Sequence, residues 1–147
     1  MRRYLVGFLL IGIASFGWLA GKAWRDARVA GPELSARADA LIADGKGWQM
    51  LGPVRRKWLL IVEDPTFETH EGIDLTTPGA GITTITQSLS KRLAFDKFQP
   101  GIAKLRQTAY AMSLEGVLTK EQILALALET YEIGPGANGW ITVLENA

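Results

Sequence analysis

The N-terminal part of the chain contains seventeen consecutive uncharged residues, from Tyr4 to Ala20, and this stretch limits what the sequence can fold into more than any other feature. An α-helix needs about 17–25 mostly apolar residues to cross a bilayer, so the stretch is just long enough. Basic residues flank it on both sides, namely Arg2, Arg3, Lys22, Arg25 and Arg28. We therefore expect residues 1–28 to form a signal anchor, a transmembrane helix with a cytoplasmic N-terminus, and residues 29–147 to form one exported domain.

Two alternatives to an anchor are compatible with the same stretch. Ala20 and Ala23 are small residues that offer weak cleavage sites, so the segment could be a signal peptide that is removed. It could also be a buried helix of a soluble fold. The flanking charges favour the anchor but leave all three open.

Composition excludes several other classes of protein. Hydrophobic residues make up 48% of the chain, too many for a disordered protein. Sixteen basic residues against fifteen acidic ones give a formal net charge of +1, so no nucleic-acid partner is expected. The chain has no cysteine, which excludes disulfides, thiolate metal sites and cysteine nucleophiles.

Helical patterns dominate the residues after the anchor, and the predicted fold class is mainly α. Gly31-Pro32 interrupts the chain, and apolar residues at helical spacing then predict a short separate helix that ends at Gly45. The apolar run 58–62 is compatible with a buried strand or with the core of a helix. Residues 75–81 predict a loop rich in turns.

Three more helices are predicted further along. An apolar stripe indicates a helix over residues 82–93, and a second stripe indicates one over residues 102–112 that stops near Gly116. Thr119 and Gln122 fit a capping box at the start of a third helix, and Gly134-Pro135-Gly136 is expected to end it.

Charge is concentrated in two short segments of opposite sign. An acid-rich segment, residues 63–74, carries Glu63, Asp64, Glu68, Glu71 and Asp74. A base-rich segment, residues 91–106, carries Lys91, Arg92, Lys97, Lys104 and Arg106, opposed by Asp96. The two segments either face each other across a cleft, with carboxylates to move protons and cations to hold an anion, or form two solvated surfaces.

Individual residues in these segments allow a chemical and a structural interpretation. Glu63 follows the apolar run, so it is either a partly desolvated proton acceptor or an exposed residue at a helix end. His70 is the only histidine, and a single imidazole is more typical of a structural hydrogen bond than of a metal site. Gly79-Ala80-Gly81 before Thr83-Thr84 suits either phosphate binding at a helix N-terminus or an ordinary capped turn, with Lys91 on the same face.

The acid-rich segment also resembles a known motif. Residues 63–74 are similar to the first motif of the peptidoglycan glycosyltransferases, E-D-x-x-F-x-x-H-x-G-x-D, and all six fixed positions are present. These enzymes are the transglycosylase domains of bifunctional penicillin-binding proteins and their monofunctional relatives, whose layout this chain resembles most.

Two later segments resemble further motifs of that family. Residues 81–92 are similar to G-x-S-T-I-T-Q-Q-L-x-K-N, with Thr83, Ser88 and Arg92 in place of Ser, Gln and Asn. Residues 120–134 are similar to the later K-x-x-I-L-E-x-Y-L-N segment, although Ala125, Ala127 and Glu129 replace its Glu, Tyr and Asn. The resemblance covers about residues 53–140.

The resemblance implies a lysozyme-like, mainly helical domain on the outer face of the bacterial cytoplasmic membrane, which polymerises lipid II into glycan strands. Glu63 would deprotonate the acceptor hydroxyl, which attacks the anomeric carbon of the growing chain, and a lipid pyrophosphate leaves. A divalent metal ion often accompanies the pyrophosphate. The residues implied in substrate binding are Asp64, Phe67, His70, Thr83, Thr84, Gln87, Lys91, Lys104 and Arg106.

The third motif of the family, R-K-x-x-E, is degenerate here. Ala103 stands at the Arg position, with Arg106 as a positional substitute, and Gln107 stands at the position of the second catalytic Glu. An amide cannot act as a base, and a positioned acid–base group is typically worth about 10²–10⁴-fold in rate. The segment between Asp74 and Gly79 and the end of the chain are also shorter than the family pattern.

Three hypotheses follow. The chain is an anchored peptidoglycan glycosyltransferase of low activity, or a degenerate relative that acts as an interaction subunit of a membrane complex, or an unrelated anchored helical domain.

Overall fold

The fold is mainly helical, as predicted. The computed structural model describes residues 2–78, 83–134 and 137–140. Its helices are α1 (Arg2–Ala43), the 3₁₀ helix η1 (Trp48–Leu51), α2 (Gly52–Glu63), α3 (Ile85–Ala94), α4 (Ile102–Glu115) and α5 (Lys120–Thr130). A short antiparallel pair follows, β1 (Glu132–Gly134) and β2 (Ala137–Asn138).

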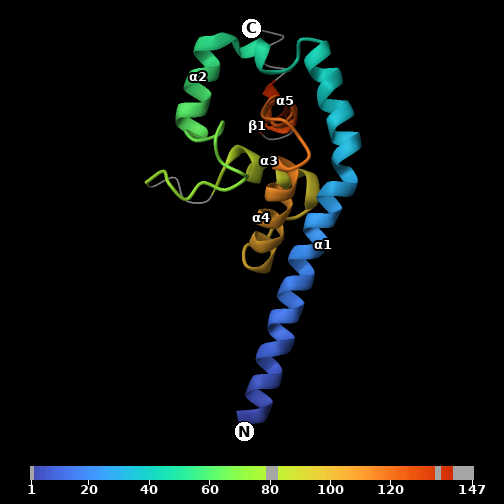
Figure 1. Ribbon diagram of the computed structural model, residues 1–147. Coiled ribbons are helices and arrows are strands. Elements are labelled where there is room, and N and C mark those ends of the chain that lie inside the picture. Colours follow the sequence, from blue (N-terminus) through green and yellow to red (C-terminus); the bar gives the residue numbers. More distant parts are fainter. Residues whose placement is uncertain (1, 79–82, 135–136, 141–147) are drawn as a thin grey trace.

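Helix α1 projects far beyond the rest of the molecule at its N-terminal end (Figure 1). Of the helices in the described residues, one is long and apolar enough to cross a membrane, and its best window has a mean hydropathy of 1.6. Only 6% of that window is buried, so the remainder of the fold does not cover it. The stretch is therefore a candidate membrane span, and the alternative of a buried helix in a soluble fold is wrong.

The expected break at Gly31-Pro32 is absent, which corrects the prediction of a separate second helix. Pro32 lies inside α1, which continues unbroken for 42 residues. A proline inside a helix costs about 3 kcal/mol, so tertiary contacts have to offset it. They do so on both sides of Pro32: Gly31 packs closely against the Val117 side chain, and Leu34 and Ala38 are buried in the core.

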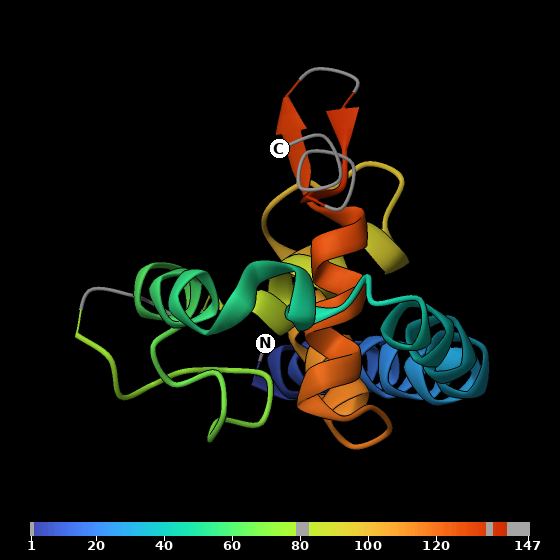
Figure 2. The same ribbon diagram turned by 90° about the horizontal axis from the view of Figure 1, so that it is seen from above.

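The core lies where α4 and α5 pack against the C-terminal half of α1 and against α3. Leu89 of α3, Leu114 of α4 and Leu126 of α5 are fully buried there. Seen from above, α5 crosses the bundle between α1 and α2, and the β1–β2 pair projects from its end (Figure 2). This arrangement places the N-terminus of α3 and the C-terminus of α5 near the end of α2.

The apolar run 58–62 is helical and largely exposed, which excludes the buried-strand interpretation. It forms most of the last turns of α2, where Trp58 is 62% and Val62 73% exposed. Because α2 packs mainly against η1, its outer apolar residues have no covering element among the described residues. Glu63, the last residue of α2, is therefore exposed rather than sealed behind a buried run.

The predicted caps are confirmed, whereas the end of α5 differs from the prediction. Thr84 caps α3 by accepting a hydrogen bond from the Gln87 amide, and Thr119 and Gln122 form the capping box of α5. Helix α5 ends at Thr130, before the Gly134 segment, because the chain turns there into β1. Gly139 closes that turn with a positive φ of 90°, donating its amide to the Tyr131 carbonyl.

Candidate active site

Glu63 lies beside the C-terminal end of α5. The Tyr131 hydroxyl donates a hydrogen bond of 2.9 Å to Oε2 of Glu63. Both residues line a pocket whose remaining walls are Leu59, Ile85, Leu124, Ala127, Leu128 and Trp140. The carboxylate is thus held at the edge of an apolar pocket, next to the first residue of α3, with one oxygen fixed by a neutral donor.

Tyr131 is a site residue that the sequence analysis missed. Burial, together with the hydrogen bond and the charge of Glu63, raises the pKa of the Tyr131 hydroxyl, so that it stays protonated and keeps donating. The guanidinium of Arg92 lies 4.5 Å from the centroid of the Tyr131 ring and opposes that rise. Tyr131 lies in the segment that resembles the later motif but at none of the fixed positions of that motif, so only the fold reveals its contact with Glu63.

We expect Glu63→Gln to lower the pKa of Tyr131 toward its ordinary value, because the substitution removes the negative charge that helps to keep the hydroxyl protonated. Burial of the ring remains and keeps the pKa above its ordinary value. The measurement is a pH titration of ¹³C-labelled tyrosine rings by NMR, with Tyr131→Phe to assign the signal. Glu68→Gln serves as the control, and an equal pKa drop in that variant would contradict the contact.

Asp64, the next residue, is buried and connects two parts of the fold through hydrogen bonds. Its Oδ2 accepts hydrogen bonds from His70 Nε2 at 2.8 Å and from the Ile85 amide at 2.9 Å. His70 Nδ1 accepts from the Gly72 amide at 2.9 Å, so the proton of the imidazole is on Nε2. His70 is therefore a hydrogen-bonding residue that joins the acid-rich loop to the N-terminus of α3, as the structural interpretation predicted.

The same loop is held to α4 and α5 by a partly buried ion pair. Lys120 Nζ donates to the His70 carbonyl and pairs with Glu115 Oε2, each at 2.7 Å. Glu115 Oε1 also accepts from the Thr86 hydroxyl at 2.5 Å. Phe67 is buried beneath the Lys120 ammonium, which lies 4.8 Å from its ring centroid. Asp64, Phe67 and His70 thus position the loop from inside and do not face solvent.

At the start of α3, one of the two candidate threonines is free to meet a ligand. Thr84 is buried, and its hydroxyl donates to the Gly72 carbonyl at 2.9 Å while it caps the helix. Thr83 is exposed. The proposed phosphate-binding turn, Gly79-Ala80-Gly81, lies outside the described residues.

Gln87 and Lys104 are brought together inside the fold. The Lys104 ammonium donates to Gln87 Oε1 at 2.5 Å, and Gln87 is fully buried. Burial lowers the pKa of Lys104. The pair joins α3 to α4, and it leaves the Gln87 amide with no solvent-facing edge.

Gln107 packs under α3 and does not line the pocket of Glu63. It is only 3% exposed, and its Nε2 donates to the Gln87 carbonyl at 2.7 Å. Its Oε1 is buried and has no hydrogen-bond partner among the described residues. The structure therefore gives Gln107 a packing role and separates it from Glu63.

We expect Gln107→Glu to destabilise the domain by about 1–3 kcal/mol at neutral pH, because a carboxylate would face the Gln87 carbonyl without a proton to donate. Urea unfolding of the full chain in mild detergent measures this loss. Gln99→Glu, at an exposed loop position, is the matched control. Equal stability of the Gln107 variant and the wild type would contradict the donor role assigned to this amide.

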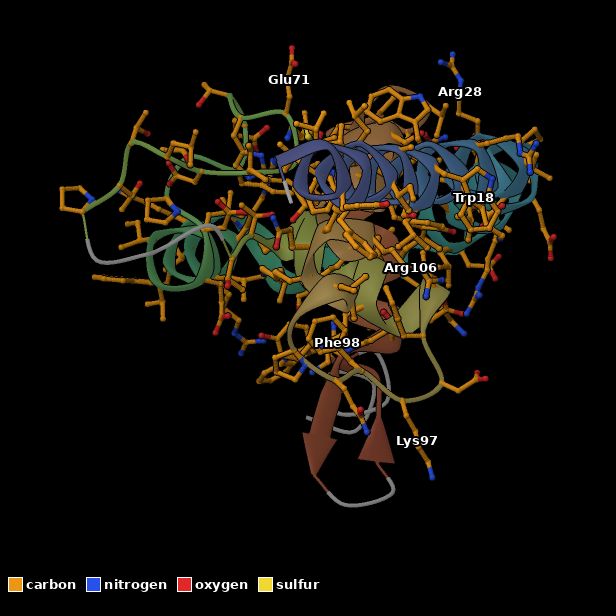
Figure 3. All side chains as sticks on the ribbon, turned by 90° about the horizontal axis from the view of Figure 1, so that it is seen from below. Trp18, Arg28, Glu71, Lys97, Phe98 and Arg106 are labelled. Atoms are coloured by element: carbon orange, nitrogen blue, oxygen red, sulfur yellow. The ribbon has the colours of Figure 1, made fainter. Side chains whose placement is uncertain are left out.

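Of the three remaining carboxylates of the acid-rich segment, Glu68 and Asp74 have local partners. Glu68 pairs with Arg56 at 2.7 Å. Hydrogen bonds led by one from Thr77 hold the pKa of the Asp74 carboxyl well below its usual range. Glu71 is exposed and points away from the fold (Figure 3).

The base-rich segment has aromatic partners instead of carboxylate ones. Lys91 lies 5.4 Å from the Phe98 ring centroid, and Arg106 lies 4.9 Å from that of Phe95. The two charged segments meet at Tyr131, which contacts Glu63 with its hydroxyl and Arg92 with its ring. Among the described residues, the charged segments therefore form neither a cleft with opposed charges nor two fully solvated surfaces.

The acidic and histidine side chains of the described residues are not arranged as the ligands of a metal ion. No group of three histidine, aspartate or glutamate side chains among them is arranged to hold an ion. We therefore derive no chemical step through a divalent metal.

Comparison with known families agrees with the motifs. The family model described as Transglycosylase matches residues 46–144, more than half of the chain. The chain therefore belongs to the transglycosylase family, and the lysozyme-like helical fold expected from the motifs is confirmed. The hypothesis of an unrelated anchored helical domain is wrong.

Among individual proteins, the chain is similar to the biosynthetic peptidoglycan transglycosylase of Vibrio parahaemolyticus serotype O3:K6 (strain RIMD 2210633). The two are 27% identical over 114 residues, which cover 67% of this chain and 51% of the relative. The chain thus spans about half the length of the curated relative that it matches. No solved structure matches the chain.

Proposed function

We propose that this protein binds a polyprenyl-pyrophosphate-linked sugar such as lipid II and transfers its glycan slowly, with Glu63 as the general base. The observation that carries the proposal is the Glu63 carboxylate, exposed beside the N-terminus of α3 and held by the Tyr131 hydroxyl at 2.9 Å. Membership of the transglycosylase family supports the choice of substrate class.

The proposed reaction is a single displacement. Glu63 takes the proton from the sugar 4-hydroxyl of the acceptor, and the resulting oxygen forms a bond to the anomeric carbon of the growing chain. The bond from that carbon to the pyrophosphate breaks, and the lipid pyrophosphate leaves with the electron pair. Tyr131 keeps one oxygen of Glu63 occupied, so that the other oxygen faces the acceptor.

Negative charge develops on the leaving pyrophosphate and requires donors at that place. Of the residues implied by the motifs, Thr83 and Lys91 have exposed side chains and are assigned to the pyrophosphate. Thr84, Gln87 and Lys104 are committed to internal hydrogen bonds, and we assign them the role of positioning α3 and α4. We assign Arg106, which lines a pocket with Ala23 and Asp26 of α1, to the donor lipid.

The membrane arrangement is part of the same proposal. Helix α1 crosses the cytoplasmic membrane once through residues 4–20, and the domain lies on the extracytoplasmic side, where lipid-linked precursors are polymerised. The exposure of the apolar half of α1 supports this arrangement.

The test uses the full chain in detergent or vesicles with fluorescent lipid II, and polymer is resolved on a gel. Polymer that moenomycin suppresses supports the proposal. Absence of polymer after long incubation, at enzyme concentrations far above those at which a monofunctional transglycosylase reacts to completion, would contradict the catalytic part.

A non-catalytic role as a lipid-pyrophosphate-binding or interaction subunit is the second candidate. Gln107 favours it, because the position of the second acid–base group holds a buried amide bonded to a backbone carbonyl. This candidate predicts that the chain retains lipid II without polymerising it and co-purifies with a stoichiometric partner. A chain that polymerises lipid II and purifies alone would exclude it.

A further inference from the structure

The loop between α3 and α4, residues 95–101, lies at the end of the domain from which the apolar half of α1 extends (Figure 1). Viewed from that end, Lys97 and Phe98 are on the loop, and Lys97 points outward (Figure 3). Ile102, the first residue of α4, follows directly. We call residues 95–102 the membrane-side loop.

Contacts with α1 show at which level along the axis of α1 this loop lies. Phe95 and Arg106 line one pocket of about 180 Å³ together with Ala23 and Asp26 of α1. Ala23 is three residues past the end of the uncharged stretch, about 4.5 Å along the helix. Helix α4 begins at Ile102, one turn before Arg106, and the N-terminal end of α4 lies toward the N-terminal end of α1 (Figure 1). The membrane-side loop is therefore level with the boundary of the candidate span.

The chemistry of the loop suits the headgroup region of a bilayer. Ile102 is 65% exposed although it is apolar, and Phe98 is half-buried. Lys97 is exposed, and among the described residues no carboxylate lies within ion-pair distance of it. An apolar side chain beside a lysine is the combination that anchors a segment at a lipid–water boundary.

The charge of neighbouring elements agrees with an anionic surface. Arg25 and Arg28 follow the uncharged stretch on α1 and are exposed, and Lys22 is balanced by Asp26 at 2.6 Å. Asp96 is the one acidic residue of the loop. Basic residues near an anionic membrane surface contribute about 1 kcal/mol each to attraction.

We propose that the membrane-side loop rests on the same bilayer that α1 crosses, with Phe98 and Ile102 in the headgroup region and Lys97 beside the phosphates of anionic phospholipids. The proposal rests on the membrane crossing of α1 proposed above. With α1, the loop forms a second point of attachment, which fixes the tilt of the domain and keeps the base-rich segment at the level of lipid phosphates.

Because the chain has no cysteine, single-cysteine variants can be labelled without background. The full chain carries an environment-sensitive fluorophore at Phe98→Cys or Ile102→Cys and is reconstituted in vesicles of phosphatidylcholine, with or without phosphatidylglycerol. Ser15→Cys reports on the anchor. Glu33→Cys is the matched control, because it is exposed on α1 about 20 Å beyond Ala20.

In vesicles with phosphatidylglycerol, labels at positions 98 and 102 should shift to the blue and be quenched by lipids that carry a headgroup nitroxide, whereas the label at Glu33→Cys should not. When Lys97→Gln is introduced into either labelled variant, the ratio of loop in contact with lipid to loop free of lipid should fall about five-fold. Quenching that is the same with and without phosphatidylglycerol would overturn the assignment to anionic lipid.

Labels at positions 98 and 102 that are as water-accessible as the control, with the Ser15→Cys label still quenched, would overturn the loop contact alone. An unquenched Ser15→Cys label would overturn the anchoring, and the loop contact with it. A blue shift that appears without lipid quenching and depends on protein concentration would indicate a second copy of the chain, and would also overturn the proposal.

Discussion

Replacing Glu63 with glutamine is expected to lower the rate of glycan polymerisation by about 100- to 10,000-fold, the range typical for removal of a positioned general base. The substitution keeps the shape of the side chain and leaves an oxygen that can still accept from Tyr131. Because Glu63 is exposed, stability should be nearly unchanged, and the effect should fall on the rate of the chemical step. Polymer formation from fluorescent lipid II, compared at saturating substrate, measures it.

Glu68→Gln is the matched control for this experiment. Glu68 lies in the same loop, is exposed and pairs with Arg56 at 2.7 Å, outside the pocket of Glu63. An exposed ion pair contributes at most about 1 kcal/mol, so this variant should keep the wild-type rate within about five-fold. Polymerisation by Glu63→Gln at the rate of Glu68→Gln would show that Glu63 is not the base.

Asp64→Ala is expected to cause the largest loss of stability, about 2–5 kcal/mol, because it leaves two buried donors, the His70 imidazole and the Ile85 amide, without their acceptor. Asp64 is 2% exposed, and its Oδ2 is shared by His70 and the first amide of α3. Without it, both donors stay buried with no acceptor, and the acid-rich loop loses its attachment to α3. Urea unfolding of the full chain in mild detergent measures the free energy of unfolding.

Two further variants keep this prediction testable if Asp64→Ala does not fold. Asp64→Asn retains an oxygen for the Ile85 amide and loses the charge, so its loss should be smaller than that of Asp64→Ala. Glu71→Ala, at an exposed position of the same loop, should change stability by less than about 0.5 kcal/mol. A loss for Asp64→Ala no larger than that for Glu71→Ala would refute the structural role.

Local sequence patterns were sufficient for several features. The apolar stripes predicted α3 and α4, and the Thr119–Gln122 capping box predicted the start of α5, because these signals depend on residues three or four positions apart. The motifs around Glu63 and Gln87 predicted the family, since motif residues are read directly from the chain.

Features that depend on distant residues were not predictable in this way. Pro32 is tolerated inside α1 because core contacts on both sides of it offset its cost, and no local pattern reports on them. The run 58–62 looks buried from its composition, yet α2 packs mainly on η1 and leaves it exposed. The contact of Glu63 with Tyr131 joins residues 68 positions apart in the sequence.

By itself, the sequence determined the transglycosylase family and the candidate membrane span, and it singled out Glu63 as the candidate general base. Each of these depends on residue types at short spacing. Only the tertiary structure decided which motif residues meet solvent. It turned Asp64, His70, Gln87 and Gln107 inward as connections between the loop, α3 and α4, and left Glu63 at the surface beside Tyr131. The physical reason is that burial depends on packing between distant helices, which short-range patterns do not encode.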